Sequence, residues 1–347
     1  MREIPDLDLA FLGCGAAAGM HSRTLSSLRE GVRLHFASRD RENSESFRKR
    51  YGGVRAYDAY EKALEEASVD VVFVTTPPDR HLDLTLAALE AGKDVIVEKP
   101  AFLRTRDFGV VRERATRSGK RVLVAENYYY KPLRARLQDI LTRNLIGEPL
   151  FLHLNAVKHQ EPRGWRSRPE EAGGGGLFEG GIHWLNLVSN LGLEVEEVAG
   201  YRAGDGSASG PEGLAEAGRE AGPPEVDTLG PGKGTAESIL AVLRFRGGCV
   251  ATLAFSWEVP SPLKGVRFSR IYGRKGTVLF ESNGLVVVVQ GPRPRLYMPG
   301  IRDLAGYRRM LRDFLRALRT GEEPQMTLEK AQRDVDLVHQ IYRSAGA

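Results

Sequence analysis

The feature that most constrains the fold is a glycine turn between a short apolar run and a helical pattern. An Asp-Leu-Ala-Phe-Leu run is followed by residues 13–19, which read Gly-Cys-Gly-Ala-Ala-Ala-Gly. Gly13 permits a tight turn at the end of a strand, and Gly15 allows the backbone to approach a bound group closely. This order predicts the first strand–turn–helix unit of a parallel sheet, with helix amides at Ala16 and Ala17 that suit a pyrophosphate. An ordinary turn can use the same residues, so the turn alone leaves ligand binding open.

The end of the second predicted strand bears on which dinucleotide is bound. This strand runs from Arg33 to Ser38, and Arg39 and Asp40 follow it. A free ribose 2′-hydroxyl is normally bound by an acid at this position, whereas a 2′-phosphate is bound by arginine and small hydroxyl residues. Ser38 and Arg39 therefore favour NADP, while an inward-turned Asp40 favours NAD. A helix-capping serine or aspartate beside a solvent-exposed arginine is a third interpretation.

The next predicted strand, residues 69–74, also ends in candidate ligand contacts. Thr75, Thr76 and Pro77 follow it and are placed to line the nicotinamide half of a cofactor. His81 lies in the first turn of the helix that comes next. It is a candidate cofactor contact, although capping or packing is its expected role.

A cation follows the strand that is predicted next. The apolar run that begins at Val95 ends in Glu98-Lys99-Pro100. Ligands of an open α/β sheet lie outside the carboxyl ends of its strands, so Lys99 places an ammonium where a substrate is expected. Such a charge can stabilise an alkoxide or a carbonyl oxygen. A lysine that points into water is the plainer interpretation of these residues taken alone.

From residue 149 onward the pattern changes from alternating strands and helices to longer strands. These strands and their turn pairs, such as Asn283-Gly284, predict a large, mostly antiparallel open sheet. One face of such a sheet is often left for a partner subunit. The predicted strands are residues 149–159, 194–202, 237–246, 249–258, 266–272, 276–281 and 284–290.

The second half also contains an insertion and two terminal helices. Residues 203–236 are rich in glycine and proline and poor in large apolar side chains, which predicts a mobile surface insertion. Apolar residues between Leu304 and Leu318 recur at helical spacing, and a last helix is predicted over residues 327–344.

Composition limits the class of protein. A chain of 347 residues with 41% hydrophobic and 27% charged residues fits two globular domains. Its net charge of +5 comes from arginines interspersed with acids, which argues against a nucleic-acid partner. No apolar window is long enough for a membrane helix, and no signal peptide is apparent, so a cytoplasmic protein is expected. Cys14 and Cys249 lack metal-ligand spacing, and no metal site is predicted.

Several separated motifs together resemble the Gfo/Idh/MocA oxidoreductases. The run from Val71 to Pro100, VVFVTTPPDRHLDLTLAALEAGKDVIVEKP, carries most of the resemblance. Residues 126–132 look like the segment that joins the two domains of that family. Gly164-Trp165-Arg166, residues 173–177 and Gly181-Ile182-His183-Trp184 look like its catalytic loop and helix.

The resemblance implies an N-terminal Rossmann dinucleotide-binding domain at residues 1–126 and a substrate and oligomerisation domain at residues 127–347. The fold class is thus α/β combined with α+β, and the C-terminal helices are expected to pack back on the first domain. Dimers or tetramers formed through the C-terminal sheet are also implied.

The same resemblance assigns the chemistry. His183 takes the proton from a secondary alcohol while Lys99 stabilises the alkoxide. Glu179 lies four residues before His183 on one predicted helix, and it orients the imidazole or contacts the substrate. The family usually has aspartate where this chain has Glu179. The other implied contacts are Glu98, Lys99 and Asn127 to the cofactor and Tyr128, Arg163, Trp165 and Arg166 to the substrate.

The prediction is therefore an NAD(P)-dependent oxidoreductase, with NADP favoured, that acts on a secondary hydroxyl or ketone of a sugar, sugar derivative or cyclitol. Two alternatives remain open at this point. One is a glycoside hydrolase that uses transient oxidation by a trapped NAD. The other is a dinucleotide-binding sensor without turnover.

Overall fold

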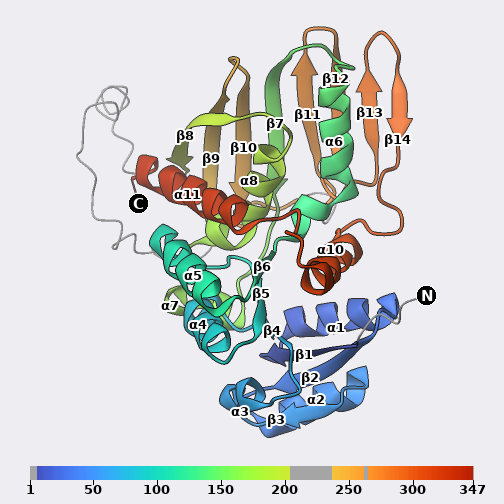
Figure 1. Cartoon of the computed structure of the whole chain (residues 1–347). Helices are drawn as coiled ribbons and strands as arrows, with labels where there is room; N and C mark the ends of the chain where they lie inside the picture. Colours follow the sequence, from blue (N-terminus) through green and yellow to red (C-terminus); the bar gives the residue numbers. More distant parts are fainter. Residues whose placement is uncertain (1–5, 204–236, 262–264, 347) are drawn as a thin grey trace. The chain divides into compact units, whose positions relative to one another are not determined.

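The structure is a computed structural model that describes residues 6–203, 237–261 and 265–346 (Figure 1). The chain forms two compact units, which are residues 1–130 with 306–332, and residues 131–305 with 333–347. None of the helices in the described ranges is long and apolar enough to cross a lipid bilayer. The predicted insertion at residues 203–236 lies, apart from Ala203, outside the described residues.

The first unit is built on a six-stranded parallel sheet with the order β3-β2-β1-β4-β5-β6. Its central strands are continuous apolar runs because helices cover both faces of a parallel sheet. The strands are β1 (Leu7–Leu12), β2 (Val32–Ala37), β3 (Arg55–Tyr57), β4 (Val71–Val74), β5 (Asp94–Glu98) and β6 (Val122–Ala125). The helices are α1 (Ala16–Leu28), α2 (Arg41–Tyr51), α3 (Tyr60–Glu65), α4 (His81–Glu90), α5 (Thr105–Ser118) and α10 (Tyr307–Thr320).

The strand order reverses direction between β1 and β4. The chain passes from β1 to β2 and β3 on one side and then returns to β4 on the other side of β1. In open α/β sheets, ligands bind outside the carboxyl ends of the strands at such a switch point. The fold of this unit therefore places the glycine turn, Thr75 and Lys99 at one edge of the sheet, as the sequence predicted.

The second unit is built on an eight-stranded sheet with the order β14-β13-β12-β11-β7-β10-β9-β8. The β7–β10 pair is parallel and the other neighbours are antiparallel, so the predicted mostly antiparallel sheet is confirmed. The strands are β7 (Pro149–Val157), β8 (Val195–Arg202), β9 (Ser238–Phe245), β10 (Val250–Ser256), β11 (Phe268–Gly273), β12 (Gly276–Glu281), β13 (Val287–Gln290) and β14 (Arg295–Tyr297). The short β14 is the strand of this sheet that the sequence pattern did not predict.

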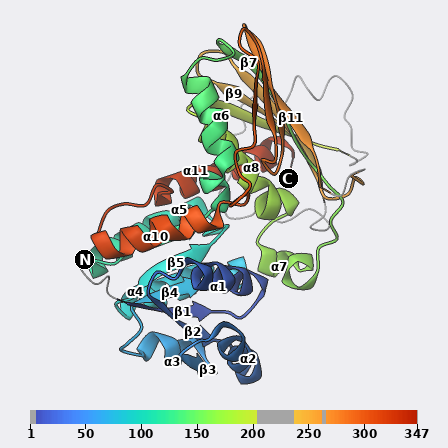
Figure 2. The ribbon, with the colours of Figure 1, turned by 90° about the vertical axis from the view of Figure 1, so that its right-hand side faces the viewer.

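Side chains alternate across this larger sheet. In β9 the burial of successive residues alternates, as expected for a sheet with one covered face. Figure 2 shows the sheet edge-on, with α6 (Pro132–Thr142) along one face. Large apolar side chains that remain exposed on its strands are Phe151, Tyr201, Leu240, Phe268, Val288 and Leu296. The remaining helices are α7 (Pro169–Ala172), α8 (Ile182–Ser189) and α11 (Leu328–Ser344).

Candidate active site

The glycine turn packs closely against the end of β4 and is hydrogen-bonded to it. Gly13 has a φ of +108°, and a Cβ at this position would lie 3.0 Å from the carbonyl oxygen of Thr75. The Thr75 amide donates to the Leu12 carbonyl at 2.9 Å. The Thr75 hydroxyl donates to the Gly13 carbonyl at 2.8 Å. Only glycine satisfies both the backbone conformation and this close approach, so the turn and the strand end form one rigid piece.

The turn continues into the N-terminus of α1, which suits an anion. Gly15 is the residue before the helix, and no described atom lies within 4 Å of the Cβ it would carry. In the part of the chain that the structure describes, no side chain caps this helix, and its first turn contains no acidic residue. The first amides of a helix have no partner within it and attract negative charge. The chain around Ala16 and Ala17 therefore fits the pyrophosphate of a dinucleotide.

At the end of β2, Ser38 and Asp40 have local partners. The Ser38 hydroxyl is largely buried and accepts from the Asp40 amide at 3.2 Å. The Asp40 carboxylate accepts from the Glu42 amide at 2.9 Å and thus caps α2. Asp40 therefore acts as a helix cap, which is the third of the interpretations that the sequence allowed. Arg39 remains exposed beside it.

Past β4, Thr76 and His81 have different surroundings. The Thr76 hydroxyl is buried and has no hydrogen-bond partner among the described residues, as expected of a group that waits for a ligand. His81 is 1% exposed, and its two ring nitrogens contact the carbonyl oxygens of Thr76 at 3.0 Å and Pro100 at 2.9 Å. Burial lowers the pKa of His81, while the two carbonyl oxygens act in the opposite direction.

His81 packs as the sequence led us to expect, and its role as a cofactor contact stays a prediction. Both ring nitrogens are already occupied by backbone carbonyl groups, and the side chain is buried. His81 joins the segment after β4 to the segment after β5.

Lys99 follows β5 and is half-buried, and the Lys99–Pro100 peptide bond is cis. Glu98 precedes it, and its carboxylate lies 2.5 Å from Nε2 of His21. The other carboxylate oxygen accepts from the Lys99 amide at 3.0 Å. Although burial raises the pKa of Glu98, the hydrogen bond from His21 and the charge of Lys99 hold it below its ordinary value.

Asn127 and Tyr128 follow the end of β6 in a short 3₁₀ turn, residues 127–130. Asn127 is buried, and Tyr128 is partly exposed. The Tyr128 amide donates to the carboxylate of Glu126 at 2.9 Å. The turn is thereby fixed at the same sheet edge as Lys99, because β6 is the parallel neighbour of β5.

In the second unit, Glu179 and His183 lie on consecutive helical segments. Glu179 is on a π-helical turn, residues 177–181, and His183 is on α8. The sequence predicted one α-helix through both residues, and the π turn changes the angle between their side chains. Such turns are often found at functional sites.

The predicted substrate residues of the second unit separate into two groups. Arg166 donates from Nε to Glu179 at 2.7 Å, and its guanidinium lies over the ring of Trp165 at 4.3 Å. These contacts bring Trp165, Arg166 and Glu179 together. Arg163, in contrast, is 85% exposed and pairs with Glu161 at 3.0 Å.

The sequence missed the groups that hold the start of this helical segment. The Glu237 carboxylate accepts from the Leu177 amide and from the Tyr342 hydroxyl, each at 2.6 Å. Burial raises the pKa of Glu237, while these two hydrogen bonds oppose the rise only in part. Glu237 and Tyr342 belong to none of the motifs. Both are far from Leu177 in the sequence, so no local pattern pointed to them.

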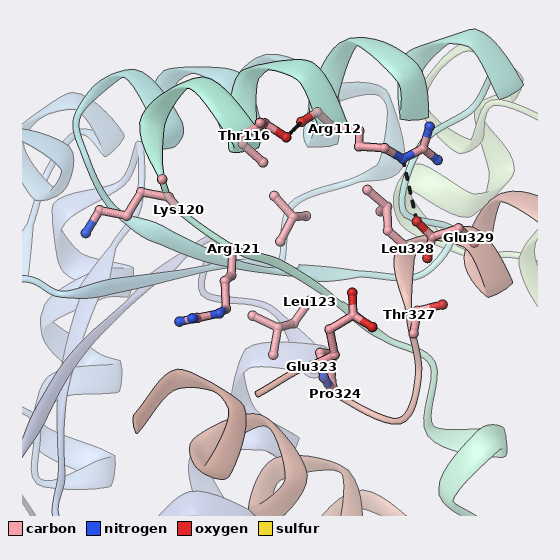
Figure 3. A pocket seen from close by; sticks show the side chains of 13 residues that line it. Arg112, Thr116, Lys120, Arg121, Leu123, Glu323, Pro324, Thr327, Leu328 and Glu329 are labelled. Atoms are coloured by element: carbon pink, nitrogen blue, oxygen red, sulfur yellow. Dashed lines mark hydrogen bonds and ion pairs between the residues drawn. The ribbon is translucent and has the colours of Figure 1, made fainter. Parts of the chain in front are cut away.

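A separate cavity of about 350 Å³ lies in the first unit, between α5 and the segment before α11 (Figure 3). Val122, the first residue of β6, is part of its lining. The predicted cofactor residues follow the opposite, carboxyl ends of their strands, so this cavity is not their site. Its lining contains both acids and bases, including Glu323 and Lys120, and its charge selects no ligand.

The two groups of candidates belong to different units. Lys99, Thr76 and the glycine turn lie in the first unit, and Glu179 and His183 lie in the second. The expectation that Lys99 and His183 meet around one substrate stays a prediction. Within the described residues, no group of three or more His, Cys, Asp or Glu side chains is arranged to hold a metal ion.

Comparison with known families covers both units. Residues 7–126 match the model of an oxidoreductase family with an NAD-binding Rossmann fold. Residues 135–279 match the C-terminal domain model of the same family. The chain belongs to the Gfo/Idh/MocA family. This membership confirms the predicted resemblance and the enzyme class, an NAD(P)-dependent oxidoreductase.

Two bacterial relatives match different shares of this chain. An oxidoreductase from Formosa agariphila is 26% identical over 55% of this chain, which covers 62% of that protein, less than two thirds of its length. A myo-inositol 2-dehydrogenase from Thermotoga maritima is 22% identical over 92% of this chain and 91% of its own.

Solved structures show the same fold. An oxidoreductase from Thermotoga maritima has a TM-score of 0.80 at 24% identity and covers 98% of this chain and 97% of its own. A levoglucosan dehydrogenase in complex with NADH has a TM-score of 0.80 at 18% identity, with 98% and 97% covered. A 3-ketoreductase from Actinomadura kijaniata in complex with NADP has a TM-score of 0.78 at 20% identity, with 98% of each chain covered. At this identity the likeness concerns the fold.

Proposed function

We propose that this protein transfers hydride between a nicotinamide dinucleotide and a secondary hydroxyl or ketone of a sugar, sugar derivative or cyclitol. The observation that carries the proposal is the N-terminus of α1, which no described side chain caps. It is joined through Gly13 to the strand end that precedes Thr76, whose hydroxyl has no partner among the described residues. Lys99 follows the next strand at the same sheet edge. Relatives named as sugar and cyclitol dehydrogenases support the substrate class.

The chain's own residues supply position and charge. When bound, the nicotinamide ring accepts or donates the hydride. A ring nitrogen of His183 takes the proton from the substrate hydroxyl and returns it in the reverse direction. The ammonium of Lys99 stabilises the negative charge that develops on the same oxygen. Glu179, held by Arg166 at 2.7 Å, positions His183 or the substrate from the neighbouring π turn.

The test is turnover on a panel of sugars and cyclitols, followed by the absorbance of the reduced nicotinamide. We expect at least one polyol to reduce the dinucleotide with sustained turnover. Dinucleotide binding without reduction of any polyol or ketone would contradict the proposal. Glycan cleavage without net reduction would do so as well.

We further propose that NADP is preferred over NAD. Ser38 and Arg39 lie at the end of β2, and the Asp40 carboxylate already caps α2, which supports a site without an acid for the ribose diol. A ligand that binds only the folded state stabilises it by about 2.7 kcal/mol at a concentration 100 times its dissociation constant. At equal concentrations we therefore expect NADP to raise the melting temperature more than NAD.

The variant that tests this preference is Arg39→Ala. The variant is expected to reduce the stabilisation by NADP and to leave the smaller stabilisation by NAD nearly unchanged, because the lost guanidinium contacts the 2′-phosphate. Stronger stabilisation of the wild type by NAD than by NADP would contradict the preference.

We propose that the exposed apolar face of the larger sheet joins two or more copies of this chain. Phe151 in β7 is 51% exposed, and it shares the sheet with the exposed apolar residues Leu240 and Phe268. Apolar patches of this kind are common at protein interfaces.

Both cysteines are free, which suits the cytoplasm as the proposed compartment.

Phe151→Glu is expected to convert the assembly to monomers, because it places a charge in a face that would be desolvated on association. Light scattering after size-exclusion chromatography measures the mass. Val110→Glu is the matched control, since Val110 is 48% exposed on α5 of the other unit. A wild-type protein that is monomeric at micromolar concentration would rule out this interface.

A further inference from the structure

We infer that His21 is a positioning residue for Lys99, which it holds through the largely buried carboxylate of Glu98. The inference rests on the proposed function, in which the Lys99 ammonium stabilises the reacting oxygen. His21 lies on α1 and Glu98 ends β5, so the contact joins the helix of the glycine turn to the strand that precedes the lysine.

The imidazole of His21 is held by one hydrogen bond and two ring contacts. Its side chain is 0% exposed, and Nε2 lies 2.5 Å from Oε1 of Glu98. The ring lies 4.5 Å from that of Phe73 in β4 and 5.5 Å, edge-on, from that of Tyr307 in α10. Nδ1 has no hydrogen-bond partner in the described part of the chain. The hydrogen bond from Nε2–H to Glu98 is therefore the polar contact that this ring is placed to make.

The carboxylate of Glu98 links this imidazole to the backbone of Lys99. Oε1 accepts from His21, and Oε2 accepts from the Lys99 amide at 3.0 Å. A buried carboxylate stays ionised only when donors and opposite charges compensate for the loss of water. Burial raises the pKa of Glu98, but His21 and Lys99 together hold it below the ordinary value. His81, on α4, is the further titratable group that feels this charge.

The geometry has a direct consequence for Lys99. A hydrogen bond to its amide restrains the backbone from which the side chain leaves the strand, and the carboxylate also interacts electrostatically with the Lys99 ammonium. Misplacement of a reacting group by about 1 Å can cost a factor of about 100 in rate. Removal of the His21 donor leaves the buried carboxylate poorly compensated, so its pKa rises and it becomes protonated more readily.

The kinetic test compares His21→Leu with His21→Gln, which keeps a donor near the position of Nε2. We expect His21→Leu to lower kcat by about tenfold to hundredfold with a much smaller change in KM. We also expect the acid limb of its kcat–pH profile to move to higher pH, because Glu98 is protonated there. His21→Gln is expected to restore most of both. A loss of packing alone would not move the acid limb.

A second measurement does not depend on activity. In the wild type the folded-state pKa of Glu98 is lowered from 4.5, so its stabilisation is present above that value and is lost as the pH falls through the folded-state pKa. In His21→Leu the folded-state pKa is raised, and stability is then gained as the pH falls. The difference in unfolding free energy between the two proteins should shrink from about pH 8 to about pH 5.

Glu98→Gln provides the matched background for both measurements. In this background, His21→Leu should change kcat by less than about twofold, and its effect on stability should no longer depend on pH. If His21→Leu does not fold, His21→Asn takes its place in the same cycle, because its shorter amide reaches the position of Nδ1 and not that of Nε2. Equal effects of the His21 substitution in the two backgrounds would overturn the inference.

Lys99→Met separates this inference from the proposed function. An inactive Lys99→Met together with a fully active His21→Leu overturns the positioning role and leaves the proposed function standing. A fully active Lys99→Met overturns the assigned chemistry itself. Inactivity of Lys99→Met with the expected loss in His21→Leu supports both.

Discussion

His183→Asn is expected to lower kcat by a factor of about 10² to 10⁴, the range that a positioned general acid–base group contributes. Asparagine keeps a polar side chain of similar size but cannot take a proton from an alcohol at neutral pH. The helix itself should remain in place, because Asn186 on α8 donates to Asp334 at 2.6 Å. The loss should therefore appear as a change in rate and not as a change in stability.

The measurement is the initial rate on the best polyol of the panel, with the melting temperature recorded for each variant. His159→Asn is the matched control, since His159 is exposed on the second unit and contacts the Glu258 carbonyl at 3.3 Å. We expect this control to retain wild-type kcat. Full turnover by His183→Asn would remove His183 from the mechanism.

Combining this substitution with Lys99→Met tests whether the two residues act on the same substrate. Residues that act as a unit in catalysis are far from additive. If both act on the same oxygen, the double variant should be little slower than the slower single variant. Fully additive losses would indicate that the two residues act on separate steps.

Gly13→Ala is expected to destabilise the protein by about 1–3 kcal/mol, the cost of holding a residue in an unfavourable backbone conformation. The φ of +108° is unfavourable for alanine, and the new Cβ would lie 3.0 Å from the Thr75 carbonyl oxygen and 3.1 Å from the Thr76 nitrogen. Backbone atoms on both sides cannot move without disturbing β1 and β4. The loss should be present without any ligand and is measured by denaturant unfolding.

Gly15→Ala is the matched comparison. Its φ of −110° is allowed for alanine, and among the described atoms nothing lies within 4 Å of the added Cβ. We expect its stability without ligand to remain within about 0.5 kcal/mol of the wild type. Dinucleotide binding, however, should weaken, because the methyl group occupies the space through which a pyrophosphate reaches the helix amides. If Gly15→Ala binds the dinucleotide as tightly as the wild type does, the pyrophosphate lies elsewhere.

The elements themselves could be predicted from local pattern. Apolar runs bounded by glycine and proline predicted β1, β4 and β5, and alternation predicted the long strands from β7 to β13. β3, residues 55–57, and β14, residues 295–297, were missed because three residues are too few to show a period.

The roles of the candidate side chains could be predicted only in part. The sequence placed Lys99 and the glycine turn at one edge, because parallel strands bring their carboxyl ends together. Helix capping by Asp40 and packing of His81 were among the interpretations that the sequence allowed. The fold shows the contacts through which both occur, and a sequence pattern alone could not choose them.

The sequence by itself determined the two kinds of sheet, the glycine turn and the strand ends that carry the candidate residues. These follow from the spacing of apolar side chains and from the backbone freedom of glycine, which are properties of neighbouring residues. Only the tertiary structure decided which groups meet, such as His21 with Glu98 across 77 residues and Leu177 with Glu237 across 60. Such contacts depend on how distant elements pack, and a local pattern holds no information on that packing.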